Sequence, residues 1–289
     1  MKLFLSCLFA LLLSYLPVMA HAAVNRPLLT TIKPLTLIAN EVTQGIEQPQ
    51  QLLANGVSAH DYALRPSERL RLQQADLVLW VGASHELFLQ KLLQSHPKTL
   101  SLDTLANGQR LPWRNLDTHL GQAHTIDAHL WLSPTNAINF AYKIAQVRGQ
   151  QYPQYALKYQ QNAANFAKKL QLQVQQLQKK FALLPTRHYV AYHDAYQYLE
   201  VAFGLQYQGS ISVSPEQAPS LKHLLALKKQ VQQQGWHCLL TEPQFDRGLA
   251  NKVFGSTGRY VMIDETFSQA RSYDAGLVQM ANAIYDCVK

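Results

Sequence analysis

The sequence predicts an α/β protein of two lobes, each a parallel β-sheet flanked by helices, with one long rigid α-helix bridging them. Short apolar runs alternate with helical segments along most of the 289 residues, a pattern typical of parallel sheets. The segment Tyr152 to Phe181 has no strong helix breaker after Pro153 and carries apolar residues at helical spacing. The chain is long enough for two lobes that each have their own core.

The first lobe is assigned to residues 23–150. Its opening strand is expected at Leu35–Ala39, an apolar run that follows Pro34. A helix is expected at Pro66–Gln74, because proline is favoured in a first helical turn. The run Asp76–Gly82, DLVLWVG, is apolar enough for a strand buried on both faces. The other elements expected here are a first helical turn at 40–45, a weaker strand at 50–54, a helix at 86–93 capped by Ser84, and a strand at 99–102.

A linking helix, assigned to residues 151–184, connects the lobes. It follows a polar stretch, Asp103–Asp127, which is expected to be a loop, and a helix that starts at Ser133-Pro134. At 1.5 Å per residue the linking helix would run roughly 40 Å, enough to reach across two lobes. The second lobe, residues 185–289, is expected to hold strands at 188–192, 205–211, 236–240 and 260–263, and helices at 195–203, 219–234, 246–254 and 274–288.

The first 22 residues are interpreted as a signal peptide. Lys2 supplies a positive start, Leu3 to Val18 is almost wholly apolar, and Ala20-His21-Ala22 is an A-x-A cleavage signal. An uncleaved membrane anchor is the alternative, but the apolar run is short for one. We therefore expect cleavage near Ala22 and a periplasmic location.

Charge and cysteines narrow the class of protein. Removal of Lys2 with the signal lowers the net charge by one, from +8 to +7. The basic residues are scattered without a dense run, so no nucleic-acid partner is expected. We interpret the charge as a solubility feature, with weak attraction to anionic membrane as a lesser alternative.

The cysteines indicate a disulfide. Cys7 is lost with the signal, and Cys238 and Cys287 remain as an even pair in an oxidising compartment. One disulfide between the last helix and a strand is the simplest interpretation, with free thiols or metal ligands as the alternative.

Four residues together supply a complete ligand set for zinc. His60, His129, His193 and Asp264 each lie where a short apolar run stops and a loop or helix begins. Ligands of open parallel sheets bind beyond the carboxyl ends of the strands. Three imidazoles and one carboxylate fill a tetrahedron around Zn²⁺ and leave no position for a reacting water. The set predicts a metal in the cleft between the lobes that is captured and not used for catalysis.

Each of these residues also has a less specific interpretation. A histidine beside an aspartate is more often a capping or surface residue, and the chain has eleven histidines. Asp264 can equally be the cap of the turn that follows it, with Glu265 as an equal candidate for the carboxylate. His85 is expected in an exposed first helical turn. The chain has no H-E-x-x-H helix, no G-x-S-x-G nucleophile elbow and no P-loop.

Three ordered segments resemble the ZnuA family, the periplasmic zinc-binding proteins of ABC-type zinc uptake. They are AHDYALRPSERLRLQQADLVLWVG, HLWLSPTNA and YHDAYQYLEVAFG, and the likeness extends over essentially the whole mature chain. The resemblance implies two small α/β lobes bridged by a rigid helix, with the metal between them. It implies His60, His129 and His193 as zinc ligands and Asp264 as the late carboxylate, although RYVMIDE is the loosest match. A disulfide in the second lobe, consistent with Cys238 and Cys287, is frequent in the family.

The resemblance implies a zinc scavenger that delivers Zn²⁺ to an inner-membrane ABC permease. Manganese-binding relatives carry a carboxylate where His193 stands, so a manganese or broad divalent carrier is the first alternative. A secreted zinc hydrolase and a metal-responsive adhesin are more distant ones. Zinc members often have a long His- and acid-rich loop, of which only His119 and His124 stand here, so an auxiliary metal role for them is doubtful. Whether a periplasmic metallochaperone loads the site is left open.

Overall fold

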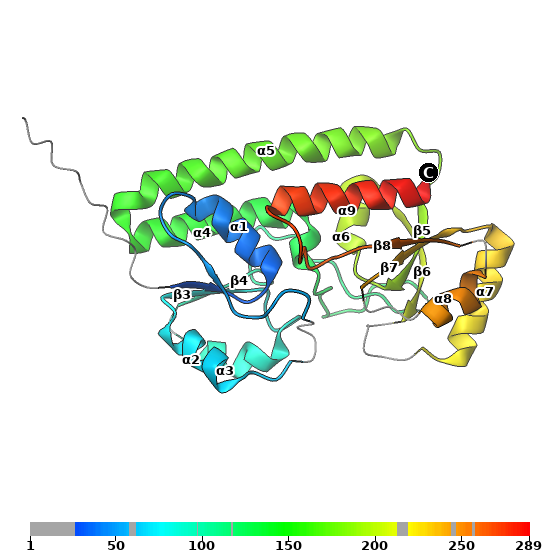
Figure 1. Cartoon of the computed structure of the whole chain (residues 1–289), viewed down its shortest axis with the longest axis horizontal. Helices are drawn as coiled ribbons and strands as arrows, with labels where there is room; N and C mark the ends of the chain where they lie inside the picture. The colour runs from blue at the N-terminus through cyan, green and yellow to red at the C-terminus, as the bar shows by residue number, and fades with distance from the viewer. Residues whose placement is uncertain are drawn as a thin grey trace, which may run out of the picture.

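Two parallel four-stranded sheets, each flanked by helices, form the two lobes, as the sequence predicts. The computed structural model describes residues 27–57, 62–96, 98–116, 118–212, 219–243, 247–255 and 258–289. The strand orders are β2-β1-β3-β4 in the first sheet and β6-β5-β7-β8 in the second. Figure 1 shows the two lobes side by side beneath α5, which runs from one to the other. The predicted signal peptide, residues 1–22, lies outside the described residues.

The first lobe contains short strands and helices in strict alternation. The central strand β3, Leu77–Trp80, is buried over most of its length, and it pairs in parallel with β1 and β4. This agrees with the strand predicted at Asp76–Gly82. The other elements are β1 (Leu28–Thr30), α1 (Lys33–Thr43), β2 (Gln50–Gln51), α2 (Pro66–Gln74), the 3₁₀ turn η1 (Leu87–Leu89), α3 (Gln90–Gln94) and β4 (Thr99–Ser101).

The predicted strand at Leu35–Ala39 is wrong, because these residues form the middle of α1. Pro34 lies in the first turn of this helix, where its missing N–H costs nothing. The helix packs against β1, α4, α5 and α9 and is therefore buried on most of its circumference. A helix buried on nearly all sides has a continuous apolar run that periodicity does not separate from a buried strand. The strand itself, β1, lies just before α1.

Two smaller predictions in this lobe also differ from the structure. The weak strand expected at 50–54 is only two residues long. Ser84 does not cap a helix, since its Oγ donates to Asp103 at 3.4 Å and the next helix starts with a 3₁₀ turn that has no side-chain cap.

Two long helices follow the polar loop. A 3₁₀ turn, η2 (Leu130–Leu132), leads to α4 (Pro134–Gln151), which starts where it was predicted, and the Ser133 hydroxyl caps its first turn. After η3 (Pro153–Tyr155) comes α5 (Ala156–Ala182), 27 residues long. It packs on α1 and α4 in the first lobe and on α6 and α9 in the second. The bridging helix is therefore confirmed, although it starts a few residues later than expected.

The second lobe repeats the alternation and follows the predicted elements closely. The chain then returns along α5, because α9 packs against both α5 and α1. Its elements are β5 (His188–His193), α6 (Gln197–Phe203), β6 (Gln206–Ser212), α7 (Leu221–Gln234), β7 (Cys238–Thr241), α8 (Arg247–Phe254), β8 (Arg259–Met262) and α9 (Tyr273–Val288).

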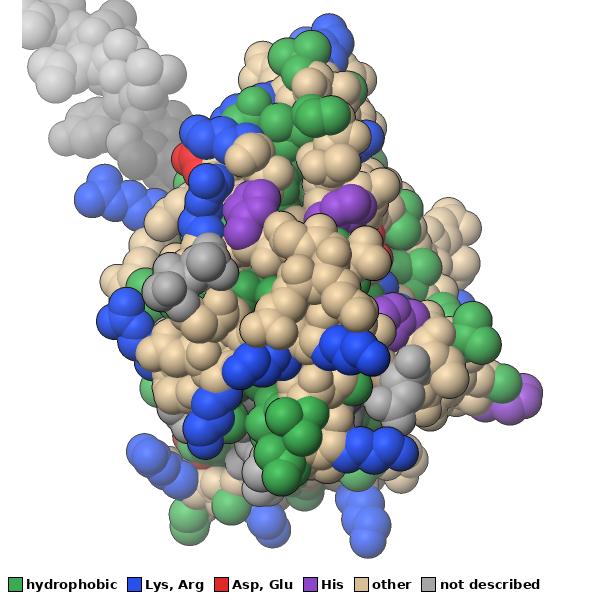
Figure 2. All heavy atoms as spheres, turned by 90° about the vertical axis from the view of Figure 1, so that its right-hand side faces the viewer, with side chains coloured by type: hydrophobic (Ala, Val, Ile, Leu, Met, Phe, Trp, Pro, Cys, Tyr) green, Lys and Arg blue, Asp and Glu red, His purple; other side chains and the backbone are tan. Residues whose placement is uncertain are grey.

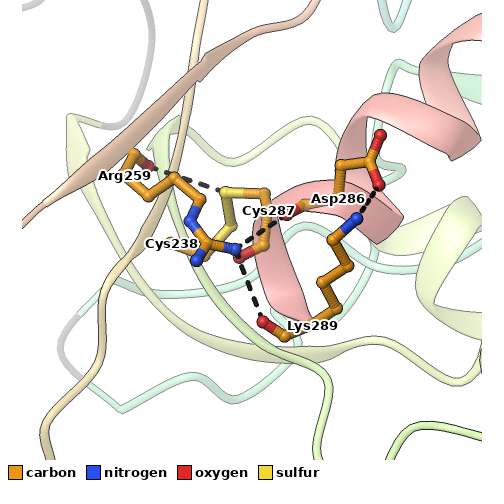
Figure 3. Close-up of a disulfide and its surroundings, with 5 residues drawn as sticks. All are labelled: Cys238, Arg259, Asp286, Cys287 and Lys289. Carbon is orange, nitrogen blue, oxygen red and sulfur yellow. Dashed lines mark hydrogen bonds and ion pairs between the residues drawn. A yellow bond between two sulfur atoms is a disulfide. The ribbon is translucent and has the colours of Figure 1, made fainter.

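The predicted disulfide between Cys238 and Cys287 is present. It joins the first residue of β7 to the last turn of α9, with the two Cα atoms 5.3 Å apart. The Arg259 guanidinium donates to the backbone carbonyls of Asp286 and Cys287 beside it (Figure 3). On the chain-entropy model, closing a loop of this length stabilises the fold by about 4 kcal/mol.

The surface carries its positive charge in dispersed form. Figure 2 shows the outer end of the second lobe, where Lys and Arg side chains stand apart from one another among polar and apolar ones. This agrees with the scattered basic residues of the sequence. Within the described part of the chain, no helix combines the length and apolar character needed to span a membrane.

Candidate metal centre

Two of the predicted ligands meet at the boundary between the lobes. His193 is the last residue of β5, and His129 directly precedes the 3₁₀ turn η2. Their side chains are nearly buried, and their Nε2 atoms are 3.2 Å apart with ring centroids 5.2 Å apart. Two imidazoles on one tetrahedral zinc ion, each with a Zn–N bond of about 2.0 Å, place their nitrogens roughly 3.3 Å and their centroids roughly 5 Å apart. The pair is therefore already spaced as two ligands of one zinc ion.

Each of these imidazoles contacts a carboxylate through its Nδ1 atom. The Nδ1 of His129 lies 2.8 Å from Asp127 Oδ1, and the Nδ1 of His193 contacts Glu242 Oε1. Asp127 also accepts the backbone N–H of His129, while the Gln197 amide donates to its second oxygen. A carboxylate at Nδ1 fixes the tautomer in which Nε2 is unprotonated and available to a metal. Both rings are thus oriented with their Nε2 atoms toward the same point.

The carboxylates around His193 raise its pKa. Burial by itself lowers the pKa of His193, but the hydrogen bond that His193 donates to Glu242 and the charges of Glu242 and Glu265 outweigh it, so the pKa lies above its usual value. The pKa of Glu265 is also raised, and here burial acts in the same direction as the shift. Burial and repulsion from Glu242 raise the pKa of Glu265 to about 7, against a smaller effect of His193. The site therefore holds protons near neutral pH, and a divalent cation that enters it displaces them.

A cavity of about 250 Å³ opens in front of the two imidazoles. Its walls come from both lobes. His85 follows β3 and His129 precedes η2 in the first lobe, whereas His193 ends β5 and Asp264 and Glu265 follow β8 in the second. Its lining includes three histidines, one tryptophan and two acidic residues, namely His85, His129, His193, Trp131, Asp264 and Glu265, together with the polar residues Lys33, Asn55, Thr266, Ser268 and Gln269.

The two acidic residues after β8 differ in their surroundings. Asp264 uses both oxygens to close the turn: Oδ1 accepts from the backbone N–H and hydroxyl of Thr266, and Oδ2 accepts from the same groups of Ser268 at 2.7 Å each. Glu265 is only 9% exposed, and its charge helps to raise the pKa of His193. Asp264 therefore caps the turn that follows it, which is the alternative role expected from the sequence. Both acidic residues line the cavity.

His60 lies outside the described residues. Val57, three positions before it in the chain, lines the cavity. Among the described residues, no three His, Cys, Asp or Glu side chains converge in a way that would hold a metal ion.

His119 and His124 do not belong to this cavity. Both lie exposed on the polar loop with positive φ angles of 56° and 61°. The ring of His119 packs edge-on against Tyr207 of β6, with centroids 5.1 Å apart.

Three residues that line or support the centre were not identified from the sequence. His85 was expected on the surface, yet its side chain is buried in the cavity wall. It follows the carboxyl end of β3, the same signal that identified His193. Glu242 directly follows β7, and Asp127 stands two positions before His129, but nothing in the sequence shows that either faces an imidazole.

Contacts between the lobes surround the centre. The Trp131 indole donates to the backbone carbonyl of Glu265 at 2.8 Å, and the Tyr273 hydroxyl donates to the carbonyl of Trp131 at 2.6 Å. Arg114 of the polar loop donates to Asp194, next to His193, and to Glu200. These bonds tie residues of the first lobe to the second close to the two imidazoles.

Comparison with known proteins points to one family. The family profile "ZnuA: Zinc-uptake complex component A periplasmic" matches residues 28–287. The chain is 31% identical to the high-affinity zinc uptake system protein ZnuA of Haemophilus ducreyi, over 91% of this chain and 92% of that one.

Solved structures share the fold. A crystal structure of ZnuA superposes with a TM-score of 0.79 at 20% identity, covering 91% of this chain and 99% of the other. The laminin-binding protein Lmb of Streptococcus agalactiae, described as a bifunctional protein with adhesin and metal-transporting activity, has a TM-score of 0.78 at 20% identity, with coverage of 91% and 100%.

Proposed function

Because the chain belongs to the ZnuA family of periplasmic zinc-uptake components, we propose that it captures Zn²⁺ with high affinity and delivers it to an ABC permease for import. The observation that carries the proposal is the spacing of the two imidazoles. The Nε2 atoms of His129 and His193 lie 3.2 Å apart, close to the edge of a zinc tetrahedron.

The proposed ligands are His60, His129 and His193, with Asp264 as the carboxylate and Glu265 as its alternative. Support for His60 comes from Val57 in the cavity wall, because three residues span at most about 10 Å. Support for the carboxylate comes from the lining, to which both acidic residues contribute. Three neutral imidazoles and one carboxylate would leave the loaded site with a net charge of +1.

Zinc is favoured over manganese by the donor set. Imidazole suits Zn²⁺, whereas Mn²⁺ prefers oxygen ligands and higher coordination numbers. The manganese-binding relatives carry a carboxylate at the position of His193, which is an imidazole in this chain.

A transport protein is favoured over a hydrolase. A catalytic zinc keeps one position for an exchangeable water, and four protein ligands would close that position. The relatives are named for zinc uptake and not for an enzymatic activity. The adhesin alternative draws only on a shared fold with the streptococcal laminin-binding protein.

The location and partners follow from the same family membership. We propose that the chain is exported, cleaved near Ala22 and active in the periplasm, with the inner-membrane permease as its protein partner. Transfer from a periplasmic metallochaperone is a further hypothesis, to be tested by comparing zinc loading in extracts with and without low-molecular-weight zinc.

Native mass spectrometry of the mature protein tests the proposal. The protein is incubated with Zn²⁺ and excess Mn²⁺, alongside His193→Ala and the exposed-loop control His119→Ala. We expect one zinc per chain in the wild type and in His119→Ala, and loss of that zinc in His193→Ala. Manganese preference, or equal effects of the two substitutions, would contradict the proposed site.

A further inference from the structure

A third imidazole, that of His85, lies in the wall of the same cavity. Its side chain is buried, with a residue exposure of 7%. The ring packs edge-on against Trp131 with centroids 4.8 Å apart, and it lies 6.3 Å from the ring of His129. His85 stands outside the ligand set proposed above.

The turn that carries His85 is held firmly. Glu86, which is fully buried, accepts hydrogen bonds from the backbone N–H groups of Val81 at 2.7 Å and Gly82 at 3.4 Å. The backbone N–H of His85 donates to the carbonyl of Gly82. Gly82 has a φ of +133°, and a Cβ there would overlap the carboxylate of Asp103. The backbone therefore places the imidazole of His85 at the cavity.

The distance between the rings of His85 and His129 limits how the two imidazoles can coordinate the same ion. Two imidazoles on opposite sides of one zinc ion have centroids at most roughly 6.4 Å apart, against roughly 5 Å for tetrahedral neighbours. The observed 6.3 Å lies near the upper limit. His85 is therefore too far to be a tetrahedral neighbour of His129, yet it is within reach of an ion that His129 also holds.

The cavity has room for an ion at more than one position. Its volume is about 250 Å³, whereas one water molecule occupies roughly 30 Å³ in the liquid. A zinc ion that still carries water molecules fits beside His85 before it reaches the final set of ligands.

We propose that His85 is a transit ligand for zinc, which coordinates the ion during loading and release and not in the final complex. The proposal rests on the proposed zinc-binding function. In each exchange one Zn–O bond to water breaks as one Zn–N bond to a neutral imidazole forms, and the reverse occurs on release, so no proton or electron is transferred. A group that coordinates the ion only in transit changes both rates by the same factor and leaves the equilibrium constant unaltered.

The test compares His85→Phe with His96→Phe in the mature chain. Phenylalanine retains an aromatic ring against Trp131 and removes both nitrogens, while His96 is half-buried and does not line the cavity. Stopped-flow mixing with Zn²⁺ measures loading, and mixing the loaded protein with a chromophoric chelator measures release. We expect His85→Phe to slow both steps about tenfold, because each transition state is then without one stabilising metal–nitrogen bond. His96→Phe should match the wild type.

Two results would overturn the transit role. One is loading and release at wild-type rates in His85→Phe. The other is faster release with weaker affinity, which would make His85 a permanent ligand. If His85→Phe does not fold, as judged by thermal unfolding, His85→Leu replaces it with the same expectation. A wild-type chain that binds no zinc would instead refute the proposed function, so the two failures are distinguishable.

Discussion

His193 and Glu242 form a buried imidazole–carboxylate pair in which Nδ1 contacts Oε1 and Nε2 faces the cavity. Glu242 has no exposed surface. Each member of the pair holds the other in place, so the ring of His193 is oriented before any metal arrives. A ligand that is already oriented loses little entropy when it binds.

Replacement of Glu242 by glutamine should weaken zinc binding by about 10- to 100-fold, the usual cost of losing a carboxylate behind a metal-binding histidine. Glutamine keeps the size of the side chain but removes the charge that favours the required tautomer. Competition with a fluorescent zinc chelator measures the change. The exposed carboxylate of Asp286 supplies the matched control, Asp286→Asn, and an equal effect in both variants would contradict the role of Glu242.

The stability of the metal-free protein should fall as pH rises toward neutrality. The pKa values of His193 and Glu265 are both raised in the folded state, so the folded protein binds more protons than the unfolded one. Their contribution is complete below the unfolded pKa values and is lost as pH rises, from about 4.5 to about 7 for Glu265 and above about 6.5 for His193. Thermal unfolding at pH 5.5 and 7.5 measures it, and a Glu265→Gln variant should show a smaller difference between the two.

Zinc affinity should change with pH in the opposite direction. The ion binds the unprotonated site and releases its protons, so affinity rises as pH increases through the same range. Calorimetry in buffers with different ionisation enthalpies counts the protons released. Affinity that stays constant from about pH 5 to 7.5 would contradict this account.

Substitutions can show which of the two acidic residues after β8, Asp264 or Glu265, is the zinc ligand. Asp264→Ala removes four hydrogen bonds of the turn, so we expect it to lower both the free energy of unfolding, by about 1–3 kcal/mol, and the zinc affinity. Glu265→Gln should leave the stability of the turn intact, because Glu265 takes no part in those four bonds. Paired unfolding and zinc titrations decide the assignment. Wild-type affinity in Glu265→Gln would leave Asp264 as the carboxylate ligand.

Loss of the disulfide should affect stability and not zinc binding. The double change Cys238→Ser and Cys287→Ser should lower the free energy of unfolding by about 4 kcal/mol. Cys238 begins β7, whereas Glu242 follows the carboxyl end of the same strand, so the centre is expected to keep its geometry. Urea unfolding and a zinc titration check the two parts. A large loss of zinc affinity in a folded variant would contradict the expectation that the disulfide affects stability and not zinc binding.

Zinc should bind with little change in overall shape. The helix α5 reaches over both lobes, and Trp131 and Arg114 tie the lobes together beside the centre. Closure by a wide hinge would break these bonds. Small-angle scattering should show a change in radius of gyration below about 1 Å, small against the backbone shifts above 2 Å that mark domain rearrangement. A large compaction would contradict it.

Local patterns in the sequence account for most of the architecture. The alternation of strands and helices, the absence of breakers in the long helix and the count of cysteines are properties of neighbouring residues or of composition. They predicted the two sheets, α5 and the pairing of Cys238 with Cys287. The rule that ligands follow the carboxyl ends of strands holds for His193, which ends β5, whereas His129 follows the polar loop and precedes η2; the structure places the two together.

Packing between distant segments set the remaining features, which became visible only in the folded chain. Helix α1 looks like a strand in the sequence because β1, β2, α4, α5 and α9 bury it on nearly all sides. His85 is buried because Trp131, 46 positions later in the chain, packs on its ring. Glu242 meets His193 because β5 and β7 are neighbours in the sheet. No local periodicity records such contacts, so the order of the strands and the packing of the lobes were needed to identify them.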